Sequence, residues 1–404
     1  MKQVLKWNFA IVVFILLLTH TICFCSERVF LFDTNFTEGY YNSTEQEKGK
    51  FGNNAMISPS IFYKLNNKNT LFSNYTVSYE ETNQVMEEEG VRWTDQVVGN
   101  TIILGWISAN INNRFQNKLS VFGYYEFTKS ARDENLNTGL YNYWDIGLKD
   151  EIRYLTEFKT KPLLITSGYK FYYRRFPNYE GLYYLIYRIG PQWEKDYIGN
   201  RLWTGAELSY SNKIYLTTQI TYLFKYYTDD LVQKEPTDES DYPYTGQKRQ
   251  EHIVNLELGC NYKFSDWLNI NLRLVPEMRR GNQNYYDPDR LTFIPNVYDY
   301  NFYSTSVDFI IKPWQELICQ TGYEFSYKRY TNNLAYDESG DYKDDKLYKL
   351  DHIAKFSASY PVYKNISITA SGFWDFSSSN TEYERIYGYN YQSSSFGLGI
   401  NYKF

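Results

Sequence analysis

Two histidines have neighbours that come closest to a catalytic arrangement. His252 follows Glu251 and His352 follows Asp351, so each imidazole has a carboxylate beside it in the chain. A hydrolase built on such a pair would also need a serine at short spacing or a second acidic pair facing the same histidine. Asp344–Asp345 supplies an acidic pair, yet adjacent residues on a strand point to opposite faces, which separates Asp351 from His352. The sequence therefore predicts no enzyme activity, no catalytic residue and no cofactor.

Three acidic clusters offer oxygen ligands for a divalent cation. They are Glu87–Glu89, Asp229–Asp230 and Asp344–Asp345. Calcium sites place their ligands at fixed alternate positions in one loop, and none of these clusters has that spacing. We therefore expect solvated loop charge and no metal, with calcium binding as the alternative.

A larger set of charged residues occupies the polar positions of segments in which apolar and polar residues alternate. The candidates for contact with a solute are Arg273, Arg279, Lys312, Lys328, Glu257, Glu277, Glu324 and Lys355. Four of the bases, Arg273, Arg279, Lys312 and Lys328, fall on three successive segments and could form a ladder for anionic solutes. Salt pairing with the three glutamates is the other interpretation, and the sequence leaves both open.

These residues lie on segments that alternate with a period of two, the signature of strands. From Val254 to Phe264, apolar side chains occupy every second position, and Cys260 falls in that apolar set. Cys319 does the same in a later segment, so both cysteines are expected on an apolar face rather than in a disulfide. The segments run to about 12–16 residues and end in Tyr, Phe and Trp, as strands that cross a bilayer do.

Short and long connections between the predicted strands alternate along the chain. The long polar ones lie near 37–54, 82–95, 130–142, 229–249, 281–300, 331–347 and 380–391. Seventeen segments can be counted as strands, but a single-chain barrel is expected to have an even number. The conflict lies within 181–228, so we predict sixteen strands, with fourteen and eighteen as alternatives.

The first 25 residues have the pattern of a secretory signal peptide. Lys2 and Lys6 precede an apolar run from Phe9 to Leu18, and small residues Cys23 and Cys25 precede Ser26. That run is shorter than the roughly 20 residues a membrane-spanning helix needs, and no later segment has 18 apolar residues in a row. We expect residues 26–404 to form the mature chain.

The composition points to an interface between lipid and water. The chain holds 44 tyrosines, and aromatic residues make up 20% of it. Tyrosine combines an apolar ring with a hydroxyl that needs water, which suits the edges of a membrane. Without its first 25 residues the chain has 40 basic and 47 acidic side chains, and this acidic balance argues against a nucleic-acid partner.

The last nine residues carry a motif. Phe396, Leu398, Ile400, Tyr402 and Phe404 alternate with Gly397, Gly399, Asn401 and Lys403. Gly399, Tyr402 and Phe404 resemble the C-terminal assembly signal of outer-membrane β-barrel proteins of Gram-negative bacteria. The resemblance implies an all-β, transmembrane, antiparallel up-and-down β-barrel in the outer membrane, recognised by the barrel-assembly machinery.

Within that superfamily the chain looks most like a porin. This resemblance implies passive diffusion of small hydrophilic solutes or ions, contact with outer-membrane lipid, and a homotrimer as one expected assembly. A barrel acting as adhesin or receptor through its outer loops is an alternative. A porin specific for acidic oligosaccharides is another.

Overall fold

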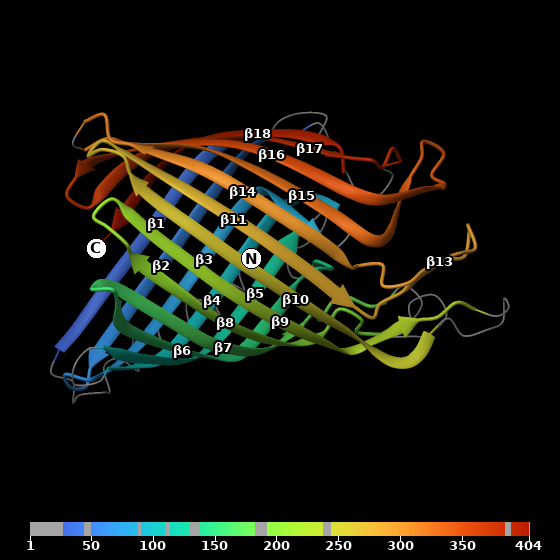
Figure 1. The fold of residues 1–404 in the computed structure, drawn as a ribbon, viewed down its shortest axis with the longest axis horizontal. Coiled ribbons are helices and arrows are strands. Elements are labelled where there is room, and N and C mark those ends of the chain that lie inside the picture. The colour runs from blue at the N-terminus through green and yellow to red at the C-terminus, as the bar shows by residue number, and fades with distance from the viewer. Residues whose placement is uncertain are drawn as a thin grey trace.

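Sixteen long strands in the described part of the chain close into one antiparallel barrel in which each strand pairs with its neighbours in sequence (Figure 1). The structure is a computed structural model, and it describes residues 27–43, 50–87, 90–109, 114–129, 138–181, 192–236, 244–314, 316–383 and 389–403. The predicted all-β, up-and-down barrel of sixteen strands is confirmed. Within these ranges no helix is long and apolar enough to cross a membrane.

The strands of the barrel are 12–22 residues long. The first eight are β1 (Glu27–Ser43), β2 (Lys50–Lys64), β3 (Asn69–Glu87), β4 (Gly90–Ala109), β5 (Phe115–Lys129), β6 (Tyr143–Phe158), β7 (Lys161–Arg175) and β8 (Tyr197–Ser209). The others are β9 (Ile214–Gln233), β10 (Tyr244–Lys263), β11 (Leu268–Gly281), β14 (Tyr300–Ile311), β15 (Ile318–Tyr336), β16 (Tyr342–Tyr363), β17 (Ile366–Ser379) and β18 (Tyr391–Lys403). A hairpin of β12 (Tyr285–Asp287) and β13 (Thr292–Ile294) lies in the connection between β11 and β14.

The barrel closes where β18 pairs with β1. Phe36 is opposite Ile400 and Thr34 is opposite Tyr402, in an unbroken antiparallel register. Closure leaves no row of unpaired backbone donors and acceptors at a sheet edge, which is the requirement for strands surrounded by lipid. The strand that carries the C-terminal motif is thus the one that completes the sheet.

The two ends of the barrel differ in their connections. The turns at one end are short, and the turn at Lys159 and Thr160 has positive φ at both residues, the backbone of a tight hairpin turn. At the other end, longer connections and strand extensions project beyond the barrel, and the β12–β13 hairpin is among them (Figure 1). We call these the short-turn end and the long-connection end.

The parity conflict in the sequence is resolved between β7 and β8. Residues 181 and 192–194, at the two ends of the segment predicted as a strand over 181–194, are not in strands, and 182–191 lie outside the described residues. The described ends of that segment were therefore wrongly counted as strand, and β7 pairs directly with β8 in the barrel. Alternation alone misled because the connection is as rich in Tyr as the strands are.

The strands also extend further than the sequence suggests. β3 and β4 remain paired from Glu81 with Gln96 to Glu87 with Gly90, within the connection expected at 82–95. Polar residues in this stretch form a hairpin that continues the sheet, because backbone hydrogen bonding does not require an apolar face. Residues 1–26, which include the predicted signal peptide, lie outside the described residues.

Candidate functional site

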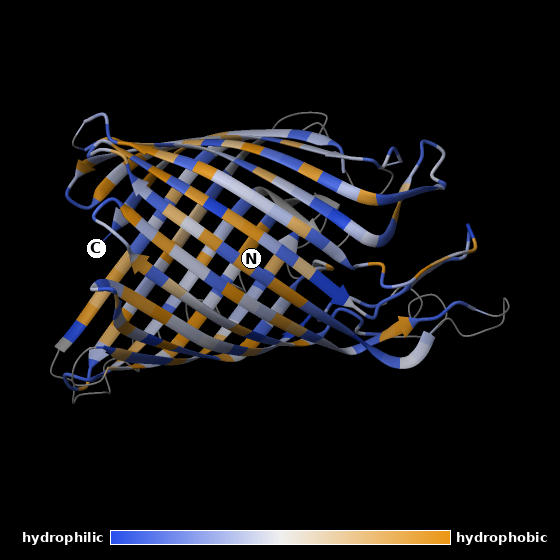
Figure 2. Ribbon diagram, viewed as in Figure 1, coloured by the Kyte–Doolittle hydropathy of each residue, from blue (hydrophilic) through white to orange (hydrophobic). Residues whose placement is uncertain are grey.

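The outer face of the barrel carries the apolar set of each strand. Leu148, Leu202, Leu272 and Leu398 lie on four different strands and are 49–56% exposed. Figure 2 shows these apolar positions recurring along the strands across the middle of the barrel, while the extensions at the long-connection end are mainly polar. An exposed apolar surface of this extent is what a transmembrane barrel presents to lipid.

The opposite face of the strands lines the lumen. Lys355 on β16 lies 3.3 Å from Asp308 on β14, although β15 runs between them. Lys170 on β7 lies 4.3 Å above the ring centre of Phe122 on β5, across β6. Side chains of strands two apart converge only on the concave side of a curved sheet, so these residues face inward.

Gly322 on β15 makes the first of these contacts possible, and Gly168 on β7 makes room for a side chain of the neighbouring strand β8. A Cβ at Gly322 would lie 2.0 Å from Asp308, and a Cβ at Gly168 would lie 2.0 Å from the indole of Trp203. Trp203 therefore rests flat on the wall at Gly168. At each of these glycines a side chain from a neighbouring strand packs directly on the backbone, because the glycine has no side chain in the way.

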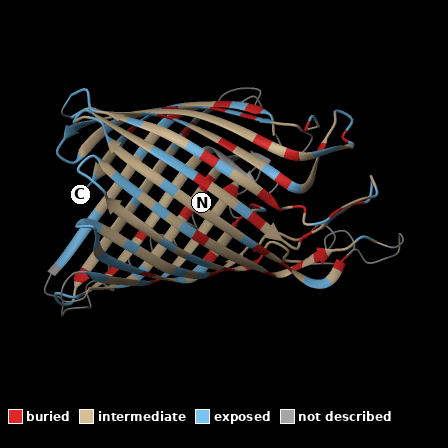
Figure 3. Ribbon diagram, viewed as in Figure 1, coloured by how far each residue is buried: buried red, intermediate tan, exposed pale blue. Residues whose placement is uncertain are grey.

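Near the long-connection end, tyrosines and basic side chains alternate around the inner wall. Each cation lies over one or two tyrosine rings, at distances from 3.8 to 5.9 Å to the ring centres. This tyrosine–cation collar comprises Tyr143, Arg174, Tyr197, Lys225, Tyr227, Arg249, Tyr298, Arg279, Tyr300, Lys328 and Tyr330. Several of its residues are among the most buried of the described residues, which gather toward this end (Figure 3).

Carboxylates hold the cations of the collar in place. Glu251 is 1% exposed and accepts hydrogen bonds from Arg249 Nε at 2.9 Å, from Arg279 and from the Tyr227 hydroxyl at 3.1 Å. Lys225 Nζ lies 3.4 Å from its other oxygen. A buried charge needs such pairing, because removing one partner leaves the others desolvated and unpaired.

The connection between β11 and β14 is anchored to this collar and to its neighbours. Tyr298 lies over Arg249 and Arg279, and Asp299 accepts a hydrogen bond from the backbone N–H of Gly281 at 2.7 Å. Burial raises the pKa of Asp299 above its ordinary value, against the effect of this hydrogen bond. At the tip, a hydrogen bond to Asp287 raises the pKa of Arg290. The connection is thus an ordered part of the long-connection end.

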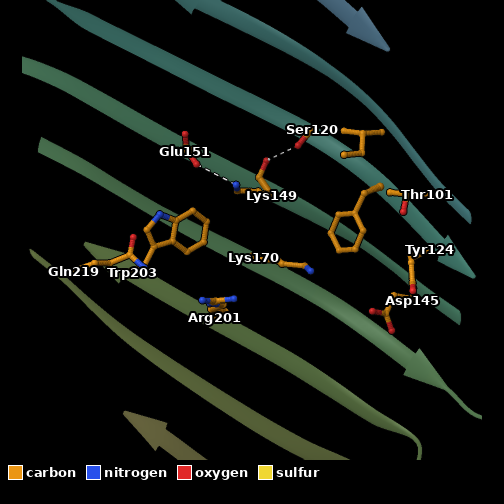
Figure 4. A pocket seen from close by; sticks show the side chains of 12 residues that line it. Thr101, Ser120, Tyr124, Asp145, Lys149, Glu151, Lys170, Arg201, Trp203 and Gln219 are labelled. Carbon is orange, nitrogen blue, oxygen red and sulfur yellow. Dashed lines mark hydrogen bonds and ion pairs between the residues drawn. The ribbon is translucent and has the colours of Figure 1, made fainter. Parts of the chain in front are cut away.

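Closer to the middle of the barrel, the inner wall from β4 to β9 forms a pocket of about 480 Å³ (Figure 4). We call it the cationic–aromatic pocket. Its charged and aromatic lining includes Lys149, Glu151, Lys170, Arg201, Trp203, Phe122 and Tyr124. Thr101, Ser120 and Gln219 add polar groups to the rim, and Ile103 and Asp145 complete the lining.

Only some of the charges in this pocket are paired. Lys149 Nζ lies 3.0 Å from Glu151, which also pairs with Arg153 at 2.8 Å. Lys170 and Arg201 have no carboxylate oxygen within 4.0 Å among the described residues. The side chains of these two cations lie side by side, in front of the wall (Figure 4). The pocket therefore presents an excess of positive charge to the lumen.

The inner wall near the closure is mainly polar, and Asp33 and Lys403 form an ion pair there at 3.8 Å. Asn35 donates a hydrogen bond to Asn401, and the Ser58 and Thr76 hydroxyls lie 2.7 Å apart. Asn74 bonds both Ser58 and Ser60. This wall offers hydrogen-bonding groups to water and solutes.

The structure pairs most of the residues selected from the sequence. Arg273 bonds Glu257 at 2.9 Å, and Arg279 pairs with Glu251 rather than with Glu277. Glu277 instead accepts a hydrogen bond from the Tyr300 hydroxyl at 2.7 Å. For Arg273 and Arg279 the structure thus agrees with salt pairing, one of the two interpretations that the sequence left open.

The remaining selected residues fall in three places. Glu324 accepts a hydrogen bond from Ser304 at 3.0 Å and lies 4.0 Å from Lys355. Lys328 belongs to the collar. Lys312 follows the end of β14 in a turn at the short-turn end and is exposed, so it does not join the other bases.

Both histidines lie on the outer face. The Tyr222 hydroxyl is 2.7 Å from Nδ1 of His252, and the Tyr323 hydroxyl is 2.6 Å from Nδ1 of His352. Asp351 points the other way and accepts a hydrogen bond from Ser326. The expected separation of Asp351 from His352 is confirmed.

Cys260 and Cys319 are free and lie on β10 and β15, which are not neighbours in the barrel. Gly399 packs against β1, where a Cβ would lie 2.5 Å from Thr37 Oγ1. Tyr402 is on β18, and Phe404 lies outside the described residues.

Sequence reasoning missed the residues of the cationic–aromatic pocket. Lys149, Lys170, Arg201 and Trp203 all occupy the polar phase of their strands, as the selected residues do. The signal that could have identified them is a tryptophan at a polar, inward position, because an indole is largely apolar and is usually found in contact with other groups.

Comparison with known proteins leaves the family of this chain unassigned. No family model matches the chain, and no curated protein sequence matches it. Among solved structures, the trimer form of OmpT, an outer membrane protein of Vibrio cholerae, is 12% identical, with 94% of this chain and 100% of that chain covered and a TM-score of 0.46.

Two other similar structures are likewise distant. A bacterial polysaccharide outer membrane secretin is 8% identical, with 93% and 98% coverage of the two chains and a TM-score of 0.46. The siderophore receptor PirA from Acinetobacter baumannii is 8% identical, with 93% and 80% coverage and a TM-score of 0.42. Function is therefore inferred from the residues and geometry of this chain.

Proposed function

We propose that this protein is a pore of the outer membrane through which small hydrophilic solutes or ions diffuse passively. The observation that carries the proposal is the division between an apolar outer face and a polar, charged inner wall on one closed barrel. A barrel of about sixteen strands is too wide for side chains to fill, and a polar lumen of that width holds water.

The charges of the inner wall support a selective rather than a neutral passage. Lys170 and Arg201 lie without carboxylate partners, while Arg273 and Arg279 are paired. Charged groups that line a narrow polar passage bias which ions enter it. The pore is therefore expected to favour anions.

A pore also accounts for the residues that first suggested chemistry. His252 and His352 bond tyrosine hydroxyls on the outer face, away from the lumen. A hydrolytic site would need a nucleophile or activated water beside them. We therefore propose that the protein is not an enzyme.

The ordered long-connection end favours a second candidate function, recognition of a partner at the cell surface. Arg290 bonds Asp287 at 3.1 Å and lies 3.6 Å from Asp341 of the next long connection. The Tyr342 hydroxyl, at the start of β16, donates to Asp287 at 3.0 Å. Connections locked to one another in this way present a fixed surface. A receptor or adhesin would use this surface and leave the lumen idle.

The proposal includes the partners that the sequence suggests. Outer-membrane lipid would contact the apolar face, and the barrel-assembly machinery would read Gly399, Tyr402 and Phe404. A homotrimer is the assembly we propose, because the outer face is extensive enough for copies to share it.

The first test is single-channel recording from the refolded mature chain in a planar bilayer, with a salt gradient across it. We expect discrete open steps of nanosiemens size, and a reversal potential whose sign reports anion preference. A barrel that is folded, as judged by its heat-modifiable migration, and yet conducts nothing would overturn the pore. It would leave the receptor as the better account.

A further inference from the structure

The cationic–aromatic pocket combines free positive charge with a flat ring surface. We propose that it is a binding site for small organic anions that carry a ring, with the anionic group at Lys170 and Arg201 and the ring on Trp203. The inference rests on the proposed pore, because the pocket faces its lumen. An aromatic carboxylate and an acidic sugar share this chemistry.

The anionic half of the site is held by its surroundings. The ammonium of Lys170 lies 4.3 Å above the Phe122 ring and 4.8 Å above the Tyr172 ring, which restrict where it can point. Arg201 is exposed to the lumen on the neighbouring strand β8. A guanidinium binds a carboxylate through two parallel hydrogen bonds, so Arg201 beside Lys170 suits that group.

The ring half of the site is the indole of Trp203. One face of this indole rests on Gly168, and its other face is turned to the lumen (Figure 4). Lys149 lies 5.1 Å from the ring centre, and its charge is offset by Glu151. A ring stacked on the indole would therefore place its carboxylate toward the two unpaired cations.

The size of the pocket fits a ligand of this class. Its volume of about 480 Å³ lies within the roughly 300–1,000 Å³ of small-molecule sites. Ser120, Thr101 and Gln219 could bond hydroxyls of a sugar, and Phe122 adds apolar surface. Acetate or chloride would gain the charge interaction alone, so these anions should bind much more weakly.

The test measures binding to the folded barrel in detergent, without any flow through it. Isothermal titration would compare benzoate, glucuronate and acetate. The variants are Arg201→Gln and Trp203→Leu, and the matched control is Arg273→Gln, which removes a guanidinium paired with Glu257 elsewhere on the inner wall. Heat-modifiable migration confirms that each variant has folded.

We expect benzoate or glucuronate to bind at least tenfold more tightly than acetate. Arg201→Gln should weaken that binding about tenfold, a loss of about 1.4 kcal/mol, and Arg273→Gln should leave it unchanged. Tighter binding of benzoate would identify an aromatic ligand, and tighter binding of glucuronate an acidic sugar. Equal affinity for all three anions, or equal losses in Arg201→Gln and Arg273→Gln, would overturn the proposal.

Conductance recorded in parallel separates this site from the pore. If the barrel conducts but binds no ring-bearing anion, the binding-site proposal is wrong and the proposed pore function stands. If the barrel binds the anion at Arg201 and Trp203 but conducts nothing, the binding site stands and the proposed pore function is wrong.

Discussion

At the scale of single residues, Glu251 is the residue on which the collar depends most. It lies on β10 and meets cations from three strands: Lys225 of β9, Arg249 of its own strand and Arg279 of β11. Without its charge, Arg249 would keep Asp230 at 3.2 Å as a carboxylate partner, while Lys225 and Arg279 would lose their pairing with Glu251. One buried carboxylate thus controls both the stability of the collar and the sign of its field.

We predict that Glu251→Gln weakens the barrel and increases its preference for anions. Removing one partner of a buried ion pair costs about 3–5 kcal/mol, so the heat-modified form should appear at a lower temperature. The reversal potential in a salt gradient should move toward that of chloride. Glu257→Gln, which affects a half-exposed pair with Arg273, should change the melting behaviour far less. Equal effects of the two variants would contradict the role given to Glu251.

At the scale of elements, the connection between β11 and β14 is held from both sides. Asn284 donates to the Gln233 carbonyl of β9, and the Tyr342 hydroxyl of β16 donates to Asp287. Asp287 is 4% exposed and also accepts hydrogen bonds from the backbone and side chain of Arg290. These bonds explain why a long polar stretch forms a hairpin and stays against its neighbours.

We predict that Asp287→Ala loosens this connection without unfolding the barrel. Arg290 would lose its closest partner, so trypsin should cleave after it several-fold faster in the folded protein. Asp289→Ala is the matched control, because Asp289 is exposed and its neighbour Asp287 keeps its bonds. Cleavage at the same rate in both variants would show that Asp287 does not hold the connection.

At the scale of the whole molecule, the barrel has two chemically distinct faces. Leu272 and Asn271 are adjacent on β11, yet Leu272 is 50% exposed on the outside and Asn271 bonds Asn261 on the inside. The same side chain should therefore have different consequences at these two positions. This difference follows only if lipid surrounds the barrel and water fills it.

We predict that Leu272→Arg impairs folding into lipid vesicles, while Asn271→Arg is tolerated. An arginine on the lipid face costs about 2–4 kcal/mol near the middle of the bilayer, and less toward its edges. The fraction of heat-modifiable, protease-protected barrel would measure the difference. If both variants fold equally well, the outer face at Leu272 is not in contact with lipid.

The sequence alone was enough to predict the all-β barrel and the face taken by most of the candidate residues. Its local pattern counted seventeen strands, and sixteen followed only from the even number expected of a single-chain barrel. These properties depend on local patterns, because a period of two, aromatic strand ends and polar turns can each be recognised in consecutive residues. The alternation that placed Arg273, Arg279 and Glu257 on the inner wall is of this kind.

The tertiary structure decided which of those inward residues meet. A period of two assigns a residue to one face of the sheet, but it does not say at what level along the barrel axis the residue lies. It therefore could not show that Arg279 pairs with Glu251 while Glu277 bonds Tyr300. Curvature then brings together strands two apart, as it does for Lys170 and Phe122 across β6. Lys170 and Arg201 lie beside Trp203 without a carboxylate partner because of the strand register and the closure of the barrel. This arrangement cannot be read from any stretch of consecutive residues.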